Sequence, residues 1–571
     1  MGQRTLAAAL TLPGVLFVTV LGLWPLADFL LGSVTAPGGG LTDAHYRQIL
    51  SDDLFITIAA RTTLLAAGVA ALTVMLAYPL AYWLMRQKGA GKGLLIALVA
   101  LPYLTSVLVR VYAWEALLAL NGPLNGLLLR LGLFASPRLL GHSLFGTTVG
   151  MVHILCPIAV LTLWSQLEKI DPSQRLVAES LGASTLRAFL TVFLPQSFPG
   201  LATAGSLVYV LALGAYVIPA ALGGTKGLLF AQLVVDEATQ LLDWEASGAM
   251  GVLMLVVAAV PVILLKGAGL ILQRRRERGD TSRLQDVIDR HLHPMLDRLP
   301  VGALRVGFAA AAVSVLIFLL LPELVVLVFS FGPEKQVSLP PSSWTLDGYR
   351  TVLSDTAWRA PAERSIVYAA LDALIATLCG TLAAYGFARG TWHWRQIGVA
   401  VLLAPLVLPE IVVAISFFVF ATKNQLAGTD LGIVLGQAVG AIGLVALVVG
   451  PVVAAVDINL EYAAQACGAS RIRAFRDIVV PLIAPGIVVG FLYGFLHAFD
   501  NLVTPLFIAG TRSTITVKMF LSMQEQLTSL PAVIASLLIF ALVAGLTVSL
   551  TSRRGAALWA TKPAALPEGS P

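Results

Sequence analysis

Charged residues are scarce in this chain of 571 residues. Asp, Glu, Lys and Arg make up 12% of the sequence, whereas they form about 25% of an ordinary soluble domain. Apolar residues make up 58% of it. This composition excludes a water-soluble protein, because too few charges are present to cover a folded surface. The sequence therefore predicts a protein that is solvated by lipid.

Cysteine and histidine are also rare. The three cysteines, Cys156, Cys379 and Cys467, lie far apart, and no CxxC spacing is present. The seven histidines are scattered along the chain. This pattern indicates neither a redox motif nor a metal site, so we expect no bound metal.

Two further patterns are missing. GAGK at 89–92 resembles a phosphate-binding loop, but Arg86 stands where GxxxxGK[ST] requires Gly, and Gly93 follows the Lys. The formal net charge is +6, yet no basic patch is interleaved with aromatic residues as in nucleic-acid binders. We therefore expect no ATPase site, no enzymatic activity, no cofactor in this chain and no binding to nucleic acid.

Long apolar runs are abundant. About 20 apolar residues in a helix cross the hydrocarbon core with every backbone polar group satisfied. Runs of this kind predict an all-α membrane protein with twelve transmembrane helices. They are expected at 10–32, 57–85, 93–119, 146–167, 200–222, 248–273, 303–331, 365–388, 396–421, 431–455, 486–508 and 531–552.

One motif occurs twice. Residues 182–200 read GASTLRAFLTVFLPQSFPG and residues 468–486 read GASRIRAFRDIVVPLIAPG, at a constant offset of 286. Upstream, YRQILSD at 46–52 matches YRTVLSD at 349–355 at an offset of 303, so the first half carries an insertion, expected between 120 and 145. Each half holds six predicted spans. An even number predicts parallel repeats related by an axis along the membrane normal.

The repeats set the domain boundaries. We expect a first six-helix half at 1–273, a linker at 274–302, a second half at 303–552 and a disordered tail at 553–571. The apolar spacing in the linker predicts an amphipathic helix on the inner membrane surface, with a solvated tether as the alternative.

Lys and Arg favour one orientation. With the N-terminus inside, cytoplasmic segments carry the positive excess, so both termini and both copies of the motif are expected in the cytoplasm. The first apolar run is too long for a typical signal peptide, and we expect it to be retained as a helix.

Each copy of the motif has the pattern of a short amphipathic helix that follows a glycine turn. Apolar residues such as Phe189 and Phe475 alternate with Arg187 and Arg473 at helical spacing. We expect Gly182 and Gly468 to interrupt the helical backbone just before this helix. Pro195 and Pro481 are expected to end it. Outside the bilayer, such a helix needs a groove in a partner.

These loops resemble the signature cytoplasmic loop of type I ABC importer permeases. The resemblance covers both halves and implies that each loop is a coupling helix that docks on a separate ATPase. Two loops then imply a homodimeric ATP-binding subunit, which holds the ATP and Mg²⁺, and a periplasmic substrate-binding protein. The residues it assigns to coupling are Gly182, Ala183, Ser184, Arg187, Phe189, Pro195, Gly468, Ala469, Ser470, Arg473, Phe475 and Pro481.

The chain departs from that signature at one position. The family has a Glu six residues before the Gly, where this chain has Leu176 and Tyr462. Glu179 and Glu461 lie nearby but out of register. Any role of the family's Glu in contacting the ATPase is therefore open here.

Closer similarity distinguishes the two halves. LPYLTSVLVRVYAW at 101–114 and LGGTKGLLFAQLVVDEATQLLDW at 222–244 resemble the first permease of spermidine/putrescine importers, whereas LPEIVVAIS at 408–416 and FDNLVTPLFIAG at 499–510 resemble the second. The resemblance implies a fusion of both permeases. Because the wider family also carries opines and aminoethylphosphonate, it implies a class of small amine-bearing solutes.

Ionisable residues inside predicted spans mark a candidate pathway, since each costs ~2.5–3.5 kcal/mol to insert. A carboxylate beside an aromatic ring suits an amine cation, whereas an anionic phosphonate would favour Arg110. Acids at helix ends in water, or Glu115 paired with Arg110, are the alternatives. The candidates are Arg110, Tyr112, Trp114, Glu115, Glu410, Asp500 and Asn501, with Asp372 as a weaker one.

Together these patterns predict the multi-pass permease of an ATP-driven importer in a bacterial inner membrane. It would move a small amine, with the polyamine class as the first candidate, into the cytoplasm by alternating access. The rivals are an ion-driven secondary transporter of small amino compounds and a membrane scaffold without transport activity.

Overall fold

The computed structural model describes residues 3–36, 40–224, 227–277, 301–335 and 338–551. Within these ranges the chain is helical apart from loops and one isolated bridge between Thr35 and Leu41. Most of the predicted linker and the predicted tail lie outside the described residues. The described chain therefore matches the expected all-α class.

The helices follow the same order in the two halves. In the first half they are α1 (Gln3–Val18), η1 (Thr19–Leu23), α2 (Trp24–Gly32), α3 (Ala44–Ser51), α4 (Asp53–Arg86), α5 (Ala90–Leu104), α6 (Val107–Leu118), α7 (Pro123–Arg130), α8 (Leu144–Leu167), α9 (Ser173–Ser180), α10 (Thr185–Ala188), η2 (Phe189–Phe193), α11 (Leu194–Leu213), α12 (Val217–Leu222), α13 (Phe230–Thr239) and α14 (Trp244–Glu277). In the second half they are α17 (Val301–Phe329), α18 (Asp347–Ser354), α19 (Thr356–Arg389), α20 (Arg395–Val407), α21 (Glu410–Lys423), α22 (Asp430–Ala455), α23 (Ile458–Ala466), α24 (Arg471–Ala474), η4 (Phe475–Val479), α25 (Val480–Asp500), α26 (Val503–Ile508), α27 (Ile515–Glu525) and α28 (Leu530–Thr551). The helix α7 lies where the insertion was predicted.

The described residues contain nine helices that are long and apolar enough to cross a membrane, or up to eleven if each of two bent pairs is one span. The last predicted span, 531–552, coincides with the helix α28, of which the apolar stretch Leu530–Ala541 is too short to enter that count. The exact count of twelve is thus not reproduced, although the repeated order of helices is.

Two predicted spans are broken. The expected straight helices at 93–119 and 396–421 are instead the pairs α5–α6 and α20–α21, which bend by 85° and 99°. At the first break, the Ser106 Oγ accepts a hydrogen bond from the Leu108 backbone N–H at 3.2 Å and starts α6 anew. At the second, Pro409 has no N–H to continue α20. The hydropathy pattern does not indicate either break, because the residues on both sides are apolar.

Two other spans are displaced from the prediction. The expected helices at 200–222 and 486–508 run instead from Thr185 to Leu213 and from Arg471 to Asp500. Each begins inside the repeated motif and ends before the short α12 or α26. One continuous helical path therefore joins each repeated motif to the interior of its half.

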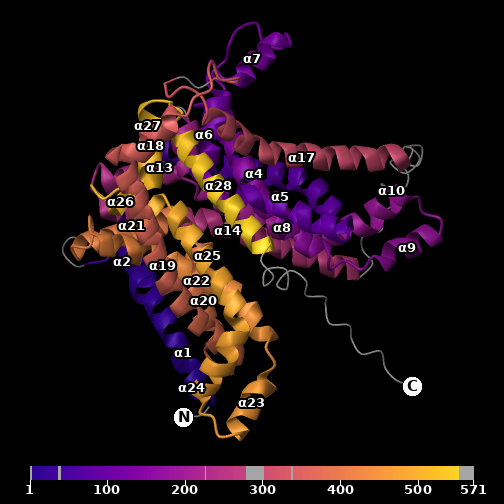
Figure 1. Cartoon of the computed structure of the whole chain (residues 1–571), viewed down its shortest axis with the longest axis vertical. Helices are drawn as coiled ribbons and strands as arrows, with labels where there is room; N and C mark the ends of the chain where they lie inside the picture. Colours follow the sequence, from indigo (N-terminus) through magenta and orange to yellow (C-terminus); the bar gives the residue numbers. More distant parts are fainter. Residues whose placement is uncertain (1–2, 37–39, 225–226, 278–300, 336–337, 552–571) are drawn as a thin grey trace.

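The first helix of each half packs on the other half. The helix α1 lies along α19 and α20, where a Cβ added to Gly386 would meet the Thr11 side chain at 2.4 Å. The helix α17 lies along α4, α5 and α6. Figure 1 shows the outcome: α1 runs with α19, α22 and α25 toward α23, while α17 runs with α4 and α5 toward α9 and α10. The two halves are thus interlocked.

Candidate functional site

The repeated glycine turns adopt the same conformation in both halves. Gly182 has φ +91° and Gly468 has φ +88°, which a residue with a Cβ rarely adopts. In the first loop the Gly182 N–H donates to the Glu179 carbonyl and the Ala183 N–H to the Ala178 carbonyl, both at 3.0 Å. In the second loop the Gly468 N–H donates to the Gln465 carbonyl and the Ala469 N–H to the Ala464 carbonyl, also at 3.0 Å. Each turn therefore caps the C-terminus of the helix before it, α9 or α23.

The serine of each motif starts the next helix. The Ser184 Oγ accepts from the Arg187 backbone N–H and the Ser470 Oγ from that of Arg473, each at 3.3 Å. These are N-caps, which satisfy one of the first free N–H groups of a helix. Gly-Ala-Ser in this register thus encodes a stop and a restart of the helix, as the sequence predicts.

The prolines do not end these helices. Pro195 and Pro481 were expected to close them, but each lies at the start of α11 or α25, in a helix that continues. The reason is a π-turn immediately before: the Leu194 N–H donates to the Phe189 carbonyl and the Val480 N–H to the Phe475 carbonyl. The wider turn shifts the hydrogen-bond register, so the missing N–H and the ring of the proline are tolerated.

The aromatic residue of each motif points inward. Phe189 packs on Tyr82 with ring centroids 5.3 Å apart, and Phe475 packs on Tyr385 at 4.5 Å. The exposed apolar side chains instead gather on and beside the helix before each glycine. They are Leu176, Val177 and Leu181 in the first loop, and Leu460 and Tyr462 in the second, with Ile472 beyond its glycine. The surface open to a partner is therefore mainly on α9 and α23.

An aspartate begins each loop. The Ser173 N–H donates to the Asp171 Oδ1 and the Asn459 N–H to the Asp457 Oδ1, each at 2.9 Å. The hydrogen bond from Ser173 holds the pKa of Asp171 below its usual range. Both loops thus open with an aspartate whose side chain accepts from the backbone and fixes the entry into the helix.

A polar cluster lies at the break between α5 and α6. Asp500, at the end of α25, accepts from the Val107 backbone N–H at 3.2 and 3.3 Å. This carboxylate from the second half therefore caps a helix of the first half, where the helix dipole favours a negative charge. The alternative to a pathway role was that Asp500 lies at a helix end in water. Asp500 does lie at the end of α25, but its carboxylate contacts the backbone of the opposite half.

Arg110 belongs to the same cluster. Its guanidinium is buried and donates to the carbonyls of Thr105 at 3.3 Å and Ile154 at 3.4 Å. It lies within electrostatic range of Asp500 and Glu323, rather than pairing with Glu115 across one turn. The Thr105 hydroxyl donates to Glu323 Oε1 at 2.7 Å.

The position in the first half that corresponds to Asp500 has no side chain. At the repeat offset of 286, Gly214 corresponds to Asp500. A Cβ added to Gly214 would meet the Pro409 Cβ at 2.9 Å, next to the start of α21. The end of each fifth span thus abuts the broken span of the opposite half, with a carboxylate on one side and a bare backbone on the other.

The other predicted pathway residues divide into two groups. Glu410 is exposed at the start of α21 and lies within electrostatic range of Asp500. Tyr112 and Trp114 are enclosed: the Tyr112 hydroxyl donates to the Thr528 carbonyl at 2.7 Å, and Trp114 packs on Phe318. These two rings join the halves.

Three further candidates lie in different surroundings. The Asn501 Oδ1 accepts from the Thr504 N–H at 3.0 Å and fixes the turn into α26. Glu115 is buried in α6. Asp372 is fully buried in α19, whose neighbours α22 and α25 belong to the same half.

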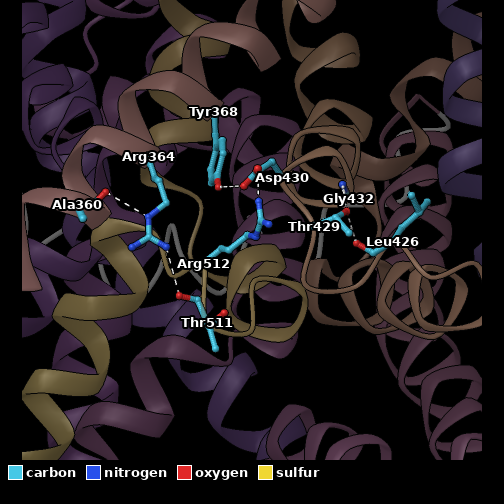
Figure 2. A network of polar contacts seen from close by, with 9 residues as sticks. All are labelled: Ala360, Arg364, Tyr368, Leu426, Thr429, Asp430, Gly432, Thr511 and Arg512. Carbon is cyan, nitrogen blue, oxygen red and sulfur yellow. Dashed lines mark hydrogen bonds and ion pairs between the residues drawn. The ribbon is translucent and has the colours of Figure 1, made fainter.

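A separate network lies at the end of α19 remote from the second loop. Figure 2 shows Asp430 between the Tyr368 hydroxyl and the Arg512 guanidinium, while Arg364 donates to the Thr511 carbonyl at 3.2 Å. It ties α19 and α22 to the loop before α27.

Sequence reasoning missed two groups of functional candidates. Glu323 is an acid within the apolar run 303–331, and the cost of such a residue was signal enough to find it. Glu461, Arg389 and Tyr385 form a buried contact in the second half that no linear pattern reveals, because the residues lie on separate helices.

A family model fits the chain twice. It describes the "Binding-protein-dependent transport system inner membrane component" and matches residues 73–278 and 376–555, more than half of the chain. The chain belongs to this family. The starts of the two matches are 303 residues apart, which is the repeat offset, so the protein is a fused pair of permease units in one multi-pass membrane chain.

Curated relatives agree. The chain is 28% identical over 233 residues to the spermidine/putrescine transport system permease protein PotB of Escherichia coli K12, covering 41% of this chain and 84% of PotB. The PotB of Haemophilus influenzae is 30% identical over 212 residues, 37% of this chain and 74% of that protein. A probable ABC transporter permease protein of Sinorhizobium fredii, y4fN, is 26% identical over 359 residues and covers 60% of each chain.

A solved structure is also similar. A chain of a bacterial ABC transporter involved in the import of the acidic polysaccharide alginate aligns with a TM-score of 0.40 at 17% identity. The alignment covers 46% of this chain and 93% of that one.

Proposed function

We propose that this permease imports a small cationic amine of the polyamine class from the periplasm and is driven by a separate ATPase dimer. The observation that carries the proposal is the pair of repeated loops with matching geometry in a chain that belongs to a binding-protein-dependent transport family. A substrate-binding protein delivers the solute to the opposite face. Both loops and both termini are cytoplasmic.

The exposed side of each loop supports docking. Leu181 is 83% exposed and Ile472 is 68% exposed, although both are large apolar residues. Exposed apolar side chains on a short, well-capped helix suit a groove in a partner. Because the two loops share one backbone geometry, two copies of the same ATPase subunit fit them.

Continuous helices give the loops a route to the interior. The path α10–η2–α11 runs from the first loop to Gly214, and α24–η4–α25 runs from the second loop to Asp500. These ends abut the broken spans of the opposite halves. Closure of the ATPase dimer on ATP then moves both helices as rigid elements and shifts the bent spans against each other.

The charge of the cluster supports a cationic solute. The Arg110 guanidinium lies within electrostatic range of two carboxyl groups, Glu323 and Asp500, and a third, Glu410, lies within range of Asp500. With the carboxyl groups ionised, two negative charges remain, and the exposed Tyr103 lies in range of Asp500. Two negative charges beside an aromatic ring suit a diamine. The spermidine/putrescine permeases among the relatives support the same class.

Reconstitution with the ATPase subunit tests the coupling role. Gly182→Val and Gly468→Val place a branched side chain at φ near +90°, so each is expected to distort its turn and reduce ATPase binding and solute uptake by about tenfold or more. Gly450→Val, in α22 with open space around it, is the matched control.

Three results would contradict the proposal. They are unchanged ATPase binding in both glycine variants, uptake by the chain alone under an ion gradient, and binding of the ATPase without any uptake. The second result would favour the secondary transporter, and the third would favour the scaffold.

A further inference from the structure

The second loop is tied to its half by a buried ion pair. Glu461 on α23 accepts from the Arg389 Nε at 2.8 Å and from the Tyr385 hydroxyl at 2.6 Å. Arg389 also donates to the Val456 carbonyl at 2.7 Å. The side chains of Arg389 and Glu461 are only 7% and 3% exposed. Three hydrogen bonds thus join the end of α19 to both the start and the body of the loop.

The first loop has the opposite charge at that position. Tyr82 and Arg86 correspond to Tyr385 and Arg389 at the offset of 303, but Arg175 takes the place of Glu461 at the offset of 286. Arg175 pairs with Glu179 at 3.5 Å, one turn along the same helix. Its contact with the Tyr82 hydroxyl is long, at 3.5 Å. The charge pair of this loop therefore stays within α9. The helix reaches its half through the long bond to Tyr82 and through an exposed hydrogen bond of 2.7 Å from Gln196 on α11 to Gln174, and neither is a buried ion pair.

The packing differs accordingly. In the first half a cavity of about 320 Å³ lies between α4, α10 and α17, lined by Tyr82, Arg86, Phe189 and Phe308 among others. The Arg86 side chain is exposed and lies over the Tyr82 ring at 5.7 Å. The helix α9 buries none of its residues, whereas α23 buries Glu461.

We infer that Glu461, Arg389 and Tyr385 are positioning residues that make the second loop the stiff contact for the ATPase, while the first loop can tilt against its span. The inference rests on the proposed function, in which both loops dock on the ATPase. A buried pair resists separation, because either partner alone would be an uncompensated charge in a poorly solvated site. The second loop therefore moves with α19 as one body, and the two ATPase contacts are mechanically unequal.

Hydrogen exchange on the full chain in nanodiscs tests the stiffness without any partner. Amides of α9 should exchange at least about tenfold faster than those of α23, since local opening of α23 must also break the buried pair. In Arg389→Gln, the rate in α23 should rise toward that of α9. Equal rates in the two loops of the unmodified chain would overturn the inference.

The complete complex with the ATPase and the binding protein tests the consequence. Arg389→Gln and Glu461→Gln should each lower uptake and stimulated ATP hydrolysis by about tenfold, while ATPase affinity stays within about twofold. Arg86→Gln, the matched change in the first half, should leave uptake within about twofold. The exchanged pair Glu461→Arg with Arg389→Glu should recover most of the uptake, which a general folding defect would not allow.

Three outcomes would overturn the inference: a loss in Arg86→Gln as large as in Arg389→Gln, a loss of ATPase affinity in Glu461→Gln, or a folded exchanged pair without recovery. If the unmodified chain binds no ATPase, the proposed function itself fails. The exchange rates would still report whether the second loop is the stiffer one.

Discussion

Single residues decide how the two halves meet. Asp500 crosses from the second half to cap α6 of the first, and its carboxyl group lies within electrostatic range of Arg110. Asp is a common cap in any helix, but here the cap and the helix are 393 residues apart in the chain. The contact stabilises the interface of the halves through one carboxylate.

Two substitutions separate the cap from the charge. Asp500→Asn keeps an oxygen that can accept from the Val107 N–H, whereas Asp500→Ala loses it. We expect Ala to lower the free energy of unfolding by ~0.5–2 kcal/mol more than Asn, the usual value of a cap. Thermal unfolding in detergent measures this. An equal loss of unfolding free energy in both variants would show that the charge of Asp500, and not its capping hydrogen bond, stabilises the protein.

Glu410 permits a test of the solute's charge. Because it is exposed beside Asp500, Glu410→Gln should raise the KM for a diamine by about tenfold or more, the loss of one charge-assisted hydrogen bond. Glu363→Gln, at an exposed ion pair on α19, is the control and should not change the KM. Uptake assays with a diamine and with an aminophosphonate measure both. A lower KM for the phosphonate would point to an anionic solute.

At the scale of elements, the turns were predictable and the breaks were not. Gly182 predicts the end of one helix and Ser184 the start of the next, because only a few residue types satisfy those backbone positions. The π-turns escaped prediction, since Phe189–Phe193 has no composition that distinguishes it from an α-helix. The bends after α5 and α20 escaped because apolar residues continue through them. Which residues meet at the polar cluster depends on those bends.

Removing one residue tests the π-turn. Deletion of Thr191 should convert the π-turn η2 to regular α-helix and rotate α9 and α10 by about 100° relative to α11. We expect a folded protein with weaker ATPase binding at that loop. Deletion of Ala202, within regular helix α11, is a control for helix shortening. Circular dichroism and ATPase binding are the measurements. Unchanged ATPase binding after deletion of Thr191 would show that the π-turn does not orient the loop.

At the scale of the whole molecule, the halves depend on each other for their first helices. The helix α1 fills the surface of α19 where Gly386 leaves room, and α17 covers α4 and α6. The family and the duplication were readable from residues 182–200 and 468–486. The exchange of first helices was not, because both helices are predominantly apolar and packing sets which helices they contact.

Splitting the chain within 278–300 tests the exchange. Residues 1–277 and 301–571, expressed together, should copurify through a tagged end and restore uptake, because each fragment carries a helix that the other needs. The fragment 33–277, which lacks α1 and α2, should copurify at least about tenfold less well. Full copurification of that shorter fragment would show that α1 is dispensable for assembly.

The contrast between Gly214 and Asp500 makes the two sides of the proposed solute pathway chemically different. Two identical units placed around an axis would present the same group from both sides, and a solute turned end for end would be bound equally well. Here one fifth span ends in the Asp500 carboxyl group and the other in the backbone of Gly214 against Pro409. Under the proposed function, we expect an elongated molecule with unlike ends to be held in one orientation, because the fusion places one of each group in every copy of the chain.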